Sequence, residues 1–219
     1  MEPTIYKPSI YKGAGIYKAG AEGGGGGEPT PIGWREITAI RYNGTKESPF
    51  ESLSFTTINT EDVFFEMLVN YGVVNAVSKL YGINCSNVIL RAYVPYDGAL
   101  DIETKNANTG THSERLYKSL PINLGLVKST VLNNVFTFGE NIITYGPGQS
   151  DISYAHPFNA SPGPLSGQEF VYHRAKKGDN YIYNFVPIAK DDNSEVAFYD
   201  KVSGTICAMR DFIGKYEIL

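Results

Sequence analysis

Apolar and polar positions alternate along much of the chain after residue 33, which is the pattern of half-buried β-strands. The alternation is clearest in residues 63–71, where every second position is apolar: Val63, Phe65, Met67, Val69 and Tyr71. Thr60 and Glu61 resemble the start of a helix, but the period of two outweighs that signal. We therefore predict a strand over this segment.

Other short segments rich in apolar and β-branched residues are bounded by turn signals, and we predict strands at 35–42, 50–58, 88–94, 100–104, 124–132, 135–138, 142–145, 168–174, 180–187, 195–199 and 205–209. Asn43-Gly44 predicts a tight hairpin after the first of them. Residues 72–82 fit a strand or a short helix, and residues 146–167, rich in Gly, Pro, Ser and Asn, predict a long surface loop. Ten to twelve strands at such spacing indicate an all-β fold, and we expect an antiparallel sandwich.

The first 33 residues do not follow this pattern. They repeat an Ile-Tyr-Lys unit three times, as Ile5, Tyr6 and Lys7, as Ile10, Tyr11 and Lys12, and as Ile16, Tyr17 and Lys18. Pro8 opposes a helix, and the five glycines Gly23–Gly27 make a flexible tether. Such repeats suit an extended strand that adds to another sheet edge, with a disordered tail as the alternative. We divide the chain into an extended docking arm, residues 1–33, and a sandwich domain, residues 34–219.

Composition and charge exclude several classes of protein. The net charge is −4, from 19 basic and 23 acidic residues, which does not suit a surface that follows phosphates, so we expect no nucleic-acid partner. No apolar run approaches the ~18 residues of a membrane span, and the N-terminus lacks the pattern of a secretion signal. Cys85 and Cys207 are too few for a disulfide framework and are expected to be small buried side chains.

The groupings of acidic residues and histidines along the sequence do not indicate an enzyme. Hydrolysis of a glycoside needs two carboxylates a fixed distance apart, and the nearest group, Glu61, Asp62 and Glu66, has the wrong spacing. The histidines, His112, His156 and His173, each lack a second ligand at metal-binding spacing. We therefore predict no catalytic residue, no metal site and no cofactor. The acidic segment 191–193 could hold calcium, but a solvated turn is the favoured interpretation.

The chain has 16 tyrosines, and exposed tyrosines can stack on sugar rings or anchor a protein interface. Tyr93, Tyr96 and Tyr145 come at predicted strand ends beside loops, where a lectin face would be built. We mark these three as candidate glycan-binding residues. The alternative is that each is packed.

The last fifty residues carry a longer pattern. Phe170-Val171-Tyr172-His173 is followed by Tyr181-Ile182-Tyr183-Asn184-Phe185-Val186-Pro187, and then by a segment ending in Tyr199-Asp200-Lys201-Val202-Ser203-Gly204-Thr205. This resembles the concanavalin A-like (laminin-G-like) jelly-roll domains of phage and prophage structural proteins from gut bacteria, closely over residues 170–206 and only in topology over 34–165. The resemblance implies a jelly-roll sandwich that binds glycans or surfaces, or decorates a virion. The family's usual Asn-x-Gly tail is replaced here by residues 208–212.

Two hypotheses follow. The first is a bacteriophage virion structural protein, a fibre, spike or decoration subunit of head or tail, made in the host cytoplasm without secretion. Its arm would bind other virion proteins, it would form a dimer or trimer, and its sandwich would face a host-surface glycan. The second is a carbohydrate-binding module of a surface-associated or prophage-encoded protein, with the arm as a linker.

Overall fold

The chain is described by a computed structural model, which covers residues 29–43, 53–58, 62–74, 78–85, 88–94, 99–106, 110–117, 120–132, 135–144, 152–156, 167–208 and 216–219. Within these ranges all regular structure is strand, and no helix occurs. In particular, the described residues contain no helix long and apolar enough to cross a membrane. The prediction of an all-β fold is confirmed.

Eleven strands form the large sheet, and its main path is β13 (Asn141–Thr144), β12 (Val135–Phe138), β11 (Leu126–Leu132), β4 (Val63–Asn70), β15 (Glu169–Lys177), β16 (Asn180–Lys190), β17 (Val196–Asp200) and β18 (Ile206–Ala208). Beside this path, β1 (Trp34–Glu36) pairs with β16, while β2 (Ile40–Tyr42) pairs with β15 and with β19 (Tyr216–Ile218).

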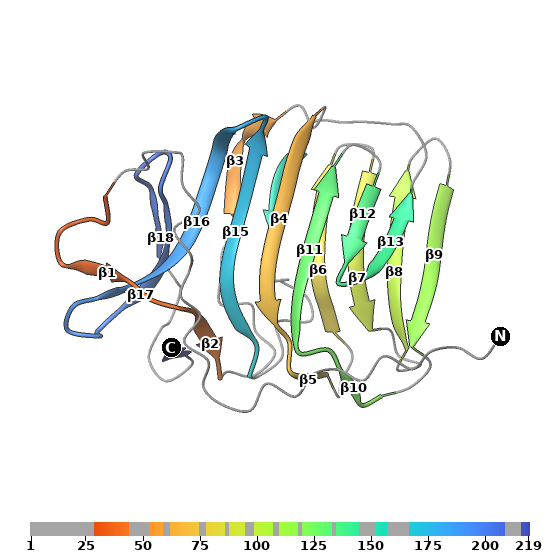
Figure 1. Ribbon diagram of the computed structural model, residues 1–219, viewed down its shortest axis with the longest axis horizontal. Helices are drawn as coiled ribbons and strands as arrows, with labels where there is room; N and C mark the ends of the chain where they lie inside the picture. The colour runs from red at the N-terminus through yellow and green to blue at the C-terminus, as the bar shows by residue number, and fades with distance from the viewer. Residues whose placement is uncertain are drawn as a thin grey trace.

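Six strands form the small sheet, in the order β3 (Leu53–Ile58), β14 (Ile152–His156), β6 (Ser78–Cys85), β7 (Val88–Val94), β8 (Leu100–Asn106) and β9 (Gly110–Tyr117). A third, two-stranded sheet joins β5 (Val73–Val74) to β10 (Ile122–Asn123). In Figure 1 the strands β6, β7 and β8 lie behind the large sheet. Pairing is antiparallel in all three sheets.

The chain crosses repeatedly between the two main sheets. It passes from β3 in the small sheet to β4 in the large one, returns for β6 to β9, and crosses again for β11 to β13. Strand β14 then enters the small sheet between β3 and β6, and β15 enters the large sheet beside β4. Crossings that bring strands distant in sequence together are the jelly-roll arrangement, so the predicted antiparallel sandwich is confirmed.

The core follows directly from the alternation in β4. Its odd-numbered residues, from Val63 to Val69, are buried on the inner face of the large sheet. They pack in one cluster with aromatic residues of the neighbouring strands and with Leu100 of β8, which belongs to the small sheet. This cluster therefore joins the two sheets, as burial of one apolar face on each sheet requires.

Strand β16 is long enough to pair with different strands along its two halves. Its first half pairs with β15, and its second half pairs with β17 on one side and β1 on the other. Figure 1 shows β1, β17 and β18 together at one end of the molecule. A second small core of Ile188, Ala197 and Tyr199 lies here, with Trp34 packed against it.

Three local predictions were wrong. The strands β2 and β3, on either side of Asn43-Gly44, do not pair as a hairpin, because β2 pairs with β15 and β19 while β3 joins the other sheet. The predicted strand 35–42 is two short strands with different partners. The predicted loop 146–167 contains β14, whose backbone is held by β3 and β6.

Candidate functional site

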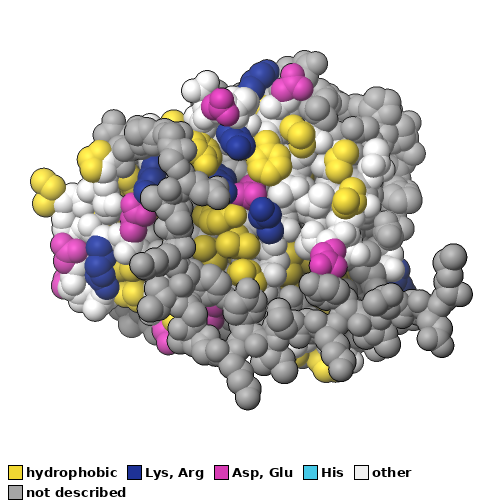
Figure 2. Space-filling model, viewed as in Figure 1, with side chains coloured by type: hydrophobic (Ala, Val, Ile, Leu, Met, Phe, Trp, Pro, Cys, Tyr) yellow, Lys and Arg dark blue, Asp and Glu magenta, His cyan; other side chains and the backbone are white. Residues whose placement is uncertain are grey.

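The outer face of the large sheet, on the side away from the core, is the candidate binding surface. The register places Glu66 of β4 between Arg174 of β15 and Thr130 of β11, and places Leu68 between Tyr172 and Lys128. We use "outer face" for the set Phe64, Glu66, Leu68, Lys128, Thr130, Leu132, Tyr172, Arg174 and Lys176. Figure 2 views the molecule from the side on which the large sheet lies in front, and shows hydrophobic, basic and acidic side chains there.

Glu66 is the centre of this face. Its side chain is only 5% exposed, and it accepts two contacts from Arg174, at 2.8 Å from Nε and 2.5 Å from Nη2. The ammonium of Lys128 lies 3.3 Å from the other carboxylate oxygen. Burial alone would raise the pKa of Glu66, but Arg174, helped by Tyr172 and Lys128, holds that pKa below its usual value. Glu66 is therefore ionised at neutral pH and unsuited to act as a general acid.

Aromatic rings flank the charged centre. The guanidinium carbon of Arg174 lies 4.4 Å from the centroid of the Tyr172 ring, and the ammonium of Lys176 lies 5.7 Å from that of Phe64. Both distances are those of cation–π contacts. Half-buried ring faces, cations and the Thr130 hydroxyl thus share one surface. Such a surface can bind a ligand by stacking and hydrogen bonding.

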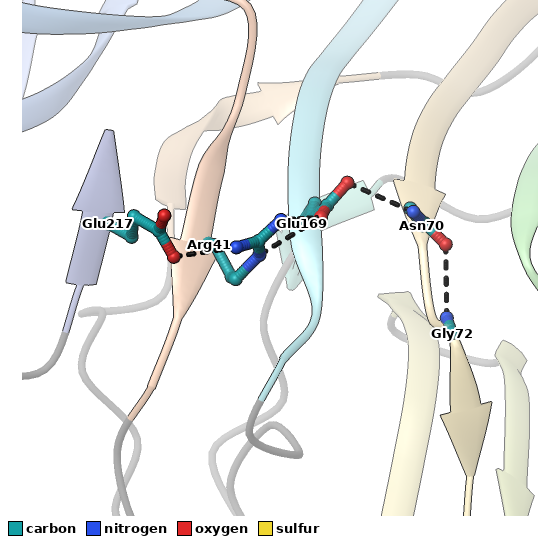
Figure 3. A network of polar contacts seen from close by, with 5 residues as sticks. All are labelled: Arg41, Asn70, Gly72, Glu169 and Glu217. Carbon is teal, nitrogen blue, oxygen red and sulfur yellow. Dashed lines mark hydrogen bonds and ion pairs between the residues drawn. The ribbon is translucent and has the colours of Figure 1, made fainter. Parts of the chain in front are cut away.

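A second polar network, drawn in Figure 3, lies on neighbouring strands and has a structural role. Arg41 of β2 contacts Glu169 of β15 at 2.6 Å and Glu217 of β19 at 2.6 Å. Glu169 also accepts a 2.9 Å hydrogen bond from Asn70, whose own side-chain oxygen accepts one from the Gly72 amide. The hydrogen bond with Glu169 raises the pKa of Arg41. This network fastens the last described strand to the sandwich.

The root of the arm, residues 29–33, is tied to the same domain. The hydroxyl of Tyr199, in β17, donates a 2.9 Å hydrogen bond to the carbonyl of Pro29. The carbonyl of Gly33 accepts a 3.0 Å hydrogen bond from the amide of Asp191, in the turn after β16. These two contacts hold both ends of the root against the β16–β17 region.

Side chains of β1 strengthen this attachment. Lys201 lies 2.6 Å from the carboxylate of Glu36, which also accepts a 3.3 Å hydrogen bond from Thr30 in the root. Trp34 packs on the small core below, and the ammonium of Lys190 lies 5.6 Å from its ring centroid. These contacts therefore fix the path of the backbone where the chain enters the sandwich.

The turn after β17 is built around Asp200. Its carboxylate accepts four hydrogen bonds, from the Asn184 amide at 2.8 Å, the Val202 amide at 3.1 Å, and the amide and hydroxyl of Ser203 at 3.3 Å and 2.7 Å. Gly204 follows with a φ of +73°, a conformation that glycine adopts without strain. The resulting hairpin, β17–β18, positions Tyr199 and Lys201 against the arm.

The acidic segment 191–193 forms an exposed turn. Asp192 accepts a 2.9 Å hydrogen bond from the Ser194 amide, and Asn193 has a φ of 61° and accepts a hydrogen bond from Arg35. Asp192 and Asn193 thus make these hydrogen bonds with other residues of the same domain. Among the residues that the structure describes, no group of three His, Cys, Asp or Glu side chains is placed to hold a metal ion.

His173 lies on the inner face of β15 and is fully buried. Its Nε2 is 3.3 Å from the Tyr183 hydroxyl, while its Nδ1 has no hydrogen-bond partner among the described residues. Burial lowers the pKa of His173 to about 3, so the ring is neutral at physiological pH. It is a packed core residue and not part of the outer face.

The residues singled out from the sequence lie elsewhere or outside the described part. Tyr93 is in β7 of the small sheet, paired with Lys79 and Asp101. Tyr96, Tyr145 and all nine residues of the Ile-Tyr-Lys repeats fall outside the described residues. The outer-face residues of β4, β11 and β15 were missed, because alternation identifies a strand's two faces but not its neighbours.

No family model matches this sequence, and no curated protein matches it. Among solved structures, the native heptameric SAP-like pentraxin from Limulus polyphemus is similar, with 15% identity and a TM-score of 0.38. That match covers 64% of this chain and 76% of the pentraxin chain. The likeness is too weak to bear on function, and the fold follows from the strand pairing described above.

Proposed function

We propose that this chain is a non-enzymatic structural subunit of a bacteriophage virion, a fibre, spike or decoration protein of head or tail. Its N-terminal arm binds other virion proteins, and its sandwich is presented outward for adhesion to a host surface. The attachment of the arm's root, through the hydrogen bond from Tyr199 to Pro29 and the pairing of β1 with β16, is the observation that carries this proposal.

A fixed root matters because it sets the point on the domain from which the arm departs. The glycines before it, Gly23–Gly27, then let the repeats reach an acceptor. The Tyr199, Lys201 and Asp191 contacts set the direction in which the arm leaves the domain. The phage context is supported by the resemblance of residues 170–206 to phage jelly-roll domains.

The test is incorporation into particles. We expect a full-length variant with Ile5, Ile10 and Ile16 all changed to Ser to fold normally and to be lost from purified virions. A matched control changes Thr4, Ser9 and Ala19, which lie beside the repeats, to Gly, and should be incorporated normally. Full incorporation of the Ile→Ser variant would refute anchoring by the arm.

The outer face favours a second candidate function, a carbohydrate-binding module. Aromatic rings beside paired charges and a hydroxyl are the groups that would stack on a sugar ring and bind its hydroxyls. On a glycan array we expect binding by the full chain, weakened about tenfold by Tyr172→Ala because a stacking ring is lost. Val73→Ser, at an exposed position outside this face, is the control. Absence of binding to any glycan would exclude this function.

A further inference from the structure

Strand β18 ends the main path of the large sheet, and within the described part of the chain its one partner is β17. The carbonyl of Thr205 accepts a 2.9 Å hydrogen bond from the amide of Asp200, so it is directed toward β17. In a trans peptide the next N–H points the opposite way, which directs the amide of Ile206 away from β17. This edge therefore carries backbone groups that can pair with an added strand.

Apolar side chains lie along this edge of β18, which has no second strand among the described residues. Ile206 in β18 and Val202 in the preceding turn are 37% and 42% exposed, and Ile32 in the arm's root is fully exposed. Single exposed apolar residues are common, but these three belong to the hairpin and the root that contact each other. An added strand with isoleucine and tyrosine side chains would cover such positions.

The arm begins next to this edge. Tyr199, which holds the Pro29 carbonyl, is the direct cross-strand partner of Ile206. Residues 1–28 precede Pro29 and contain the three Ile-Tyr-Lys units. The segment best suited to strand addition thus leaves the domain one strand away from an edge that is unpaired within the described ranges.

We propose that residues 5–18 of one copy add as a strand to β18 of a second copy. This rests on the proposed function in that it takes the arm to be a docking strand, and it makes a second copy of this chain one acceptor of that strand. Neighbouring strands of a hairpin are usually joined by two to five residues. The ten residues 19–28 include six glycines and extend to roughly 33 Å, which suits a neighbouring copy. Because root and edge share one end, two copies can exchange arms reciprocally, which closes as a dimer in the isolated protein.

The decisive variant is Ile206→Pro in the full-length chain. Proline removes the outward N–H and leaves the pairing with β17 intact, because that N–H faces away from it. We expect light scattering to give a dimer for the unaltered chain and a monomer for Ile206→Pro. Ile206→Val, which keeps both the N–H and an apolar side chain, should remain a dimer. A monomeric unaltered chain, or an Ile206→Pro variant that dimerises unchanged, would overturn the proposal.

Two further measurements separate causes of failure. Far-UV circular dichroism checks that Ile206→Pro is folded. The variant Ile206→Lys leaves the backbone intact and should weaken the dimer at least tenfold, because it places a charge on the edge. If arm variants lose virion incorporation while Ile206→Lys and Ile206→Pro still dimerise normally, the arm anchors the protein but β18 is not its acceptor. If arm variants are incorporated normally, the proposed function itself fails.

Discussion

The two faces of the large sheet differ in the partners that their buried polar side chains have. On the inner face, His173 is surrounded by apolar residues, and one of its ring nitrogens has no hydrogen-bond partner in the described part. On the outer face, Glu66 is almost as deeply buried but has two cationic partners and an aromatic neighbour. The inner face is thus a packing surface, whereas the outer face is an organised polar one.

This difference bears on function because folding does not require an organised outer face. Replacing a buried ion pair with apolar residues of similar volume often leaves stability unchanged or improves it. The inner face explains why the sheets pack together. Packing does not require the charged centre around Glu66, with cations stacked on Tyr172 and Phe64, and this centre is what the proposed carbohydrate-binding function uses.

The largest effect is expected from shortening an inner residue. Phe65→Ala removes a ring that is fully buried, 6.4 Å from the Tyr183 ring, and should cost about 3–5 kcal/mol of unfolding free energy. Phe64→Ala, one position along the same strand but on the half-buried outer face, should cost less than half as much. Urea unfolding measures both. Equal losses would mean that the two faces do not differ in packing.

The alternation that separates these faces could be predicted from the sequence, but the outer site could not. Residues 63–71 show the period of two directly, and the strand follows from it. Arg174 and Glu66, however, are 108 residues apart, and no local pattern reveals that β15 pairs with β4. Register between distant strands comes from the whole jelly roll, through crossings that depend on several elements at once.

Local turn signals failed for the same reason. Asn43-Gly44 is a strong hairpin sequence, yet β2 pairs with β15 and β19. Strand β14 lies among Gly, Pro and Ser residues, and its strand conformation comes from the two edges between which it inserts. The Asp200 turn was predictable, because an Asp side chain bonds to backbone amides within three residues of itself.

An intermediate effect is expected from pH, through the inner face. The pKa of His173 is about 3 in the folded chain and near 6.5 when unfolded, so the unfolded chain binds the extra proton between these values. Stability is therefore full above pH 6.5 and falls as the pH drops, by about 2 kcal/mol between pH 7 and pH 5. Urea midpoints at pH 7, 6 and 5 measure this loss.

His173→Leu provides the comparison, since it removes the titrating ring and leaves an apolar side chain. The variant should lose less stability than the unaltered chain over the same pH range. Glu66 has a lowered pKa and is present in both proteins, so its own titration cancels in the comparison. Parallel pH profiles for the two proteins would show that His173 is not the group responsible.

The smallest effect is expected from the charged centre of the outer face. Among the described residues, Arg174→Ala leaves Glu66 with Lys128 as its one ionic partner. It should cost about 1–2 kcal/mol, less than for a fully enclosed pair because Arg174 is 32% exposed. It should also raise the pKa of Glu66, since burial then meets less opposition. Urea unfolding and an NMR titration of the Glu66 carboxyl measure the two changes.

The double variant Glu66→Leu with Arg174→Met asks what these charges are for. If they serve a ligand, the apolar pair should restore the stability lost in Arg174→Ala while binding on the glycan array is still lost. Restored stability with unchanged glycan binding would separate the charges from recognition and leave the rings as the binding groups. A double variant as unstable as Arg174→Ala would mean that the ion pair supports the fold. The two faces would then differ in the chemistry of their side chains, and both would serve stability.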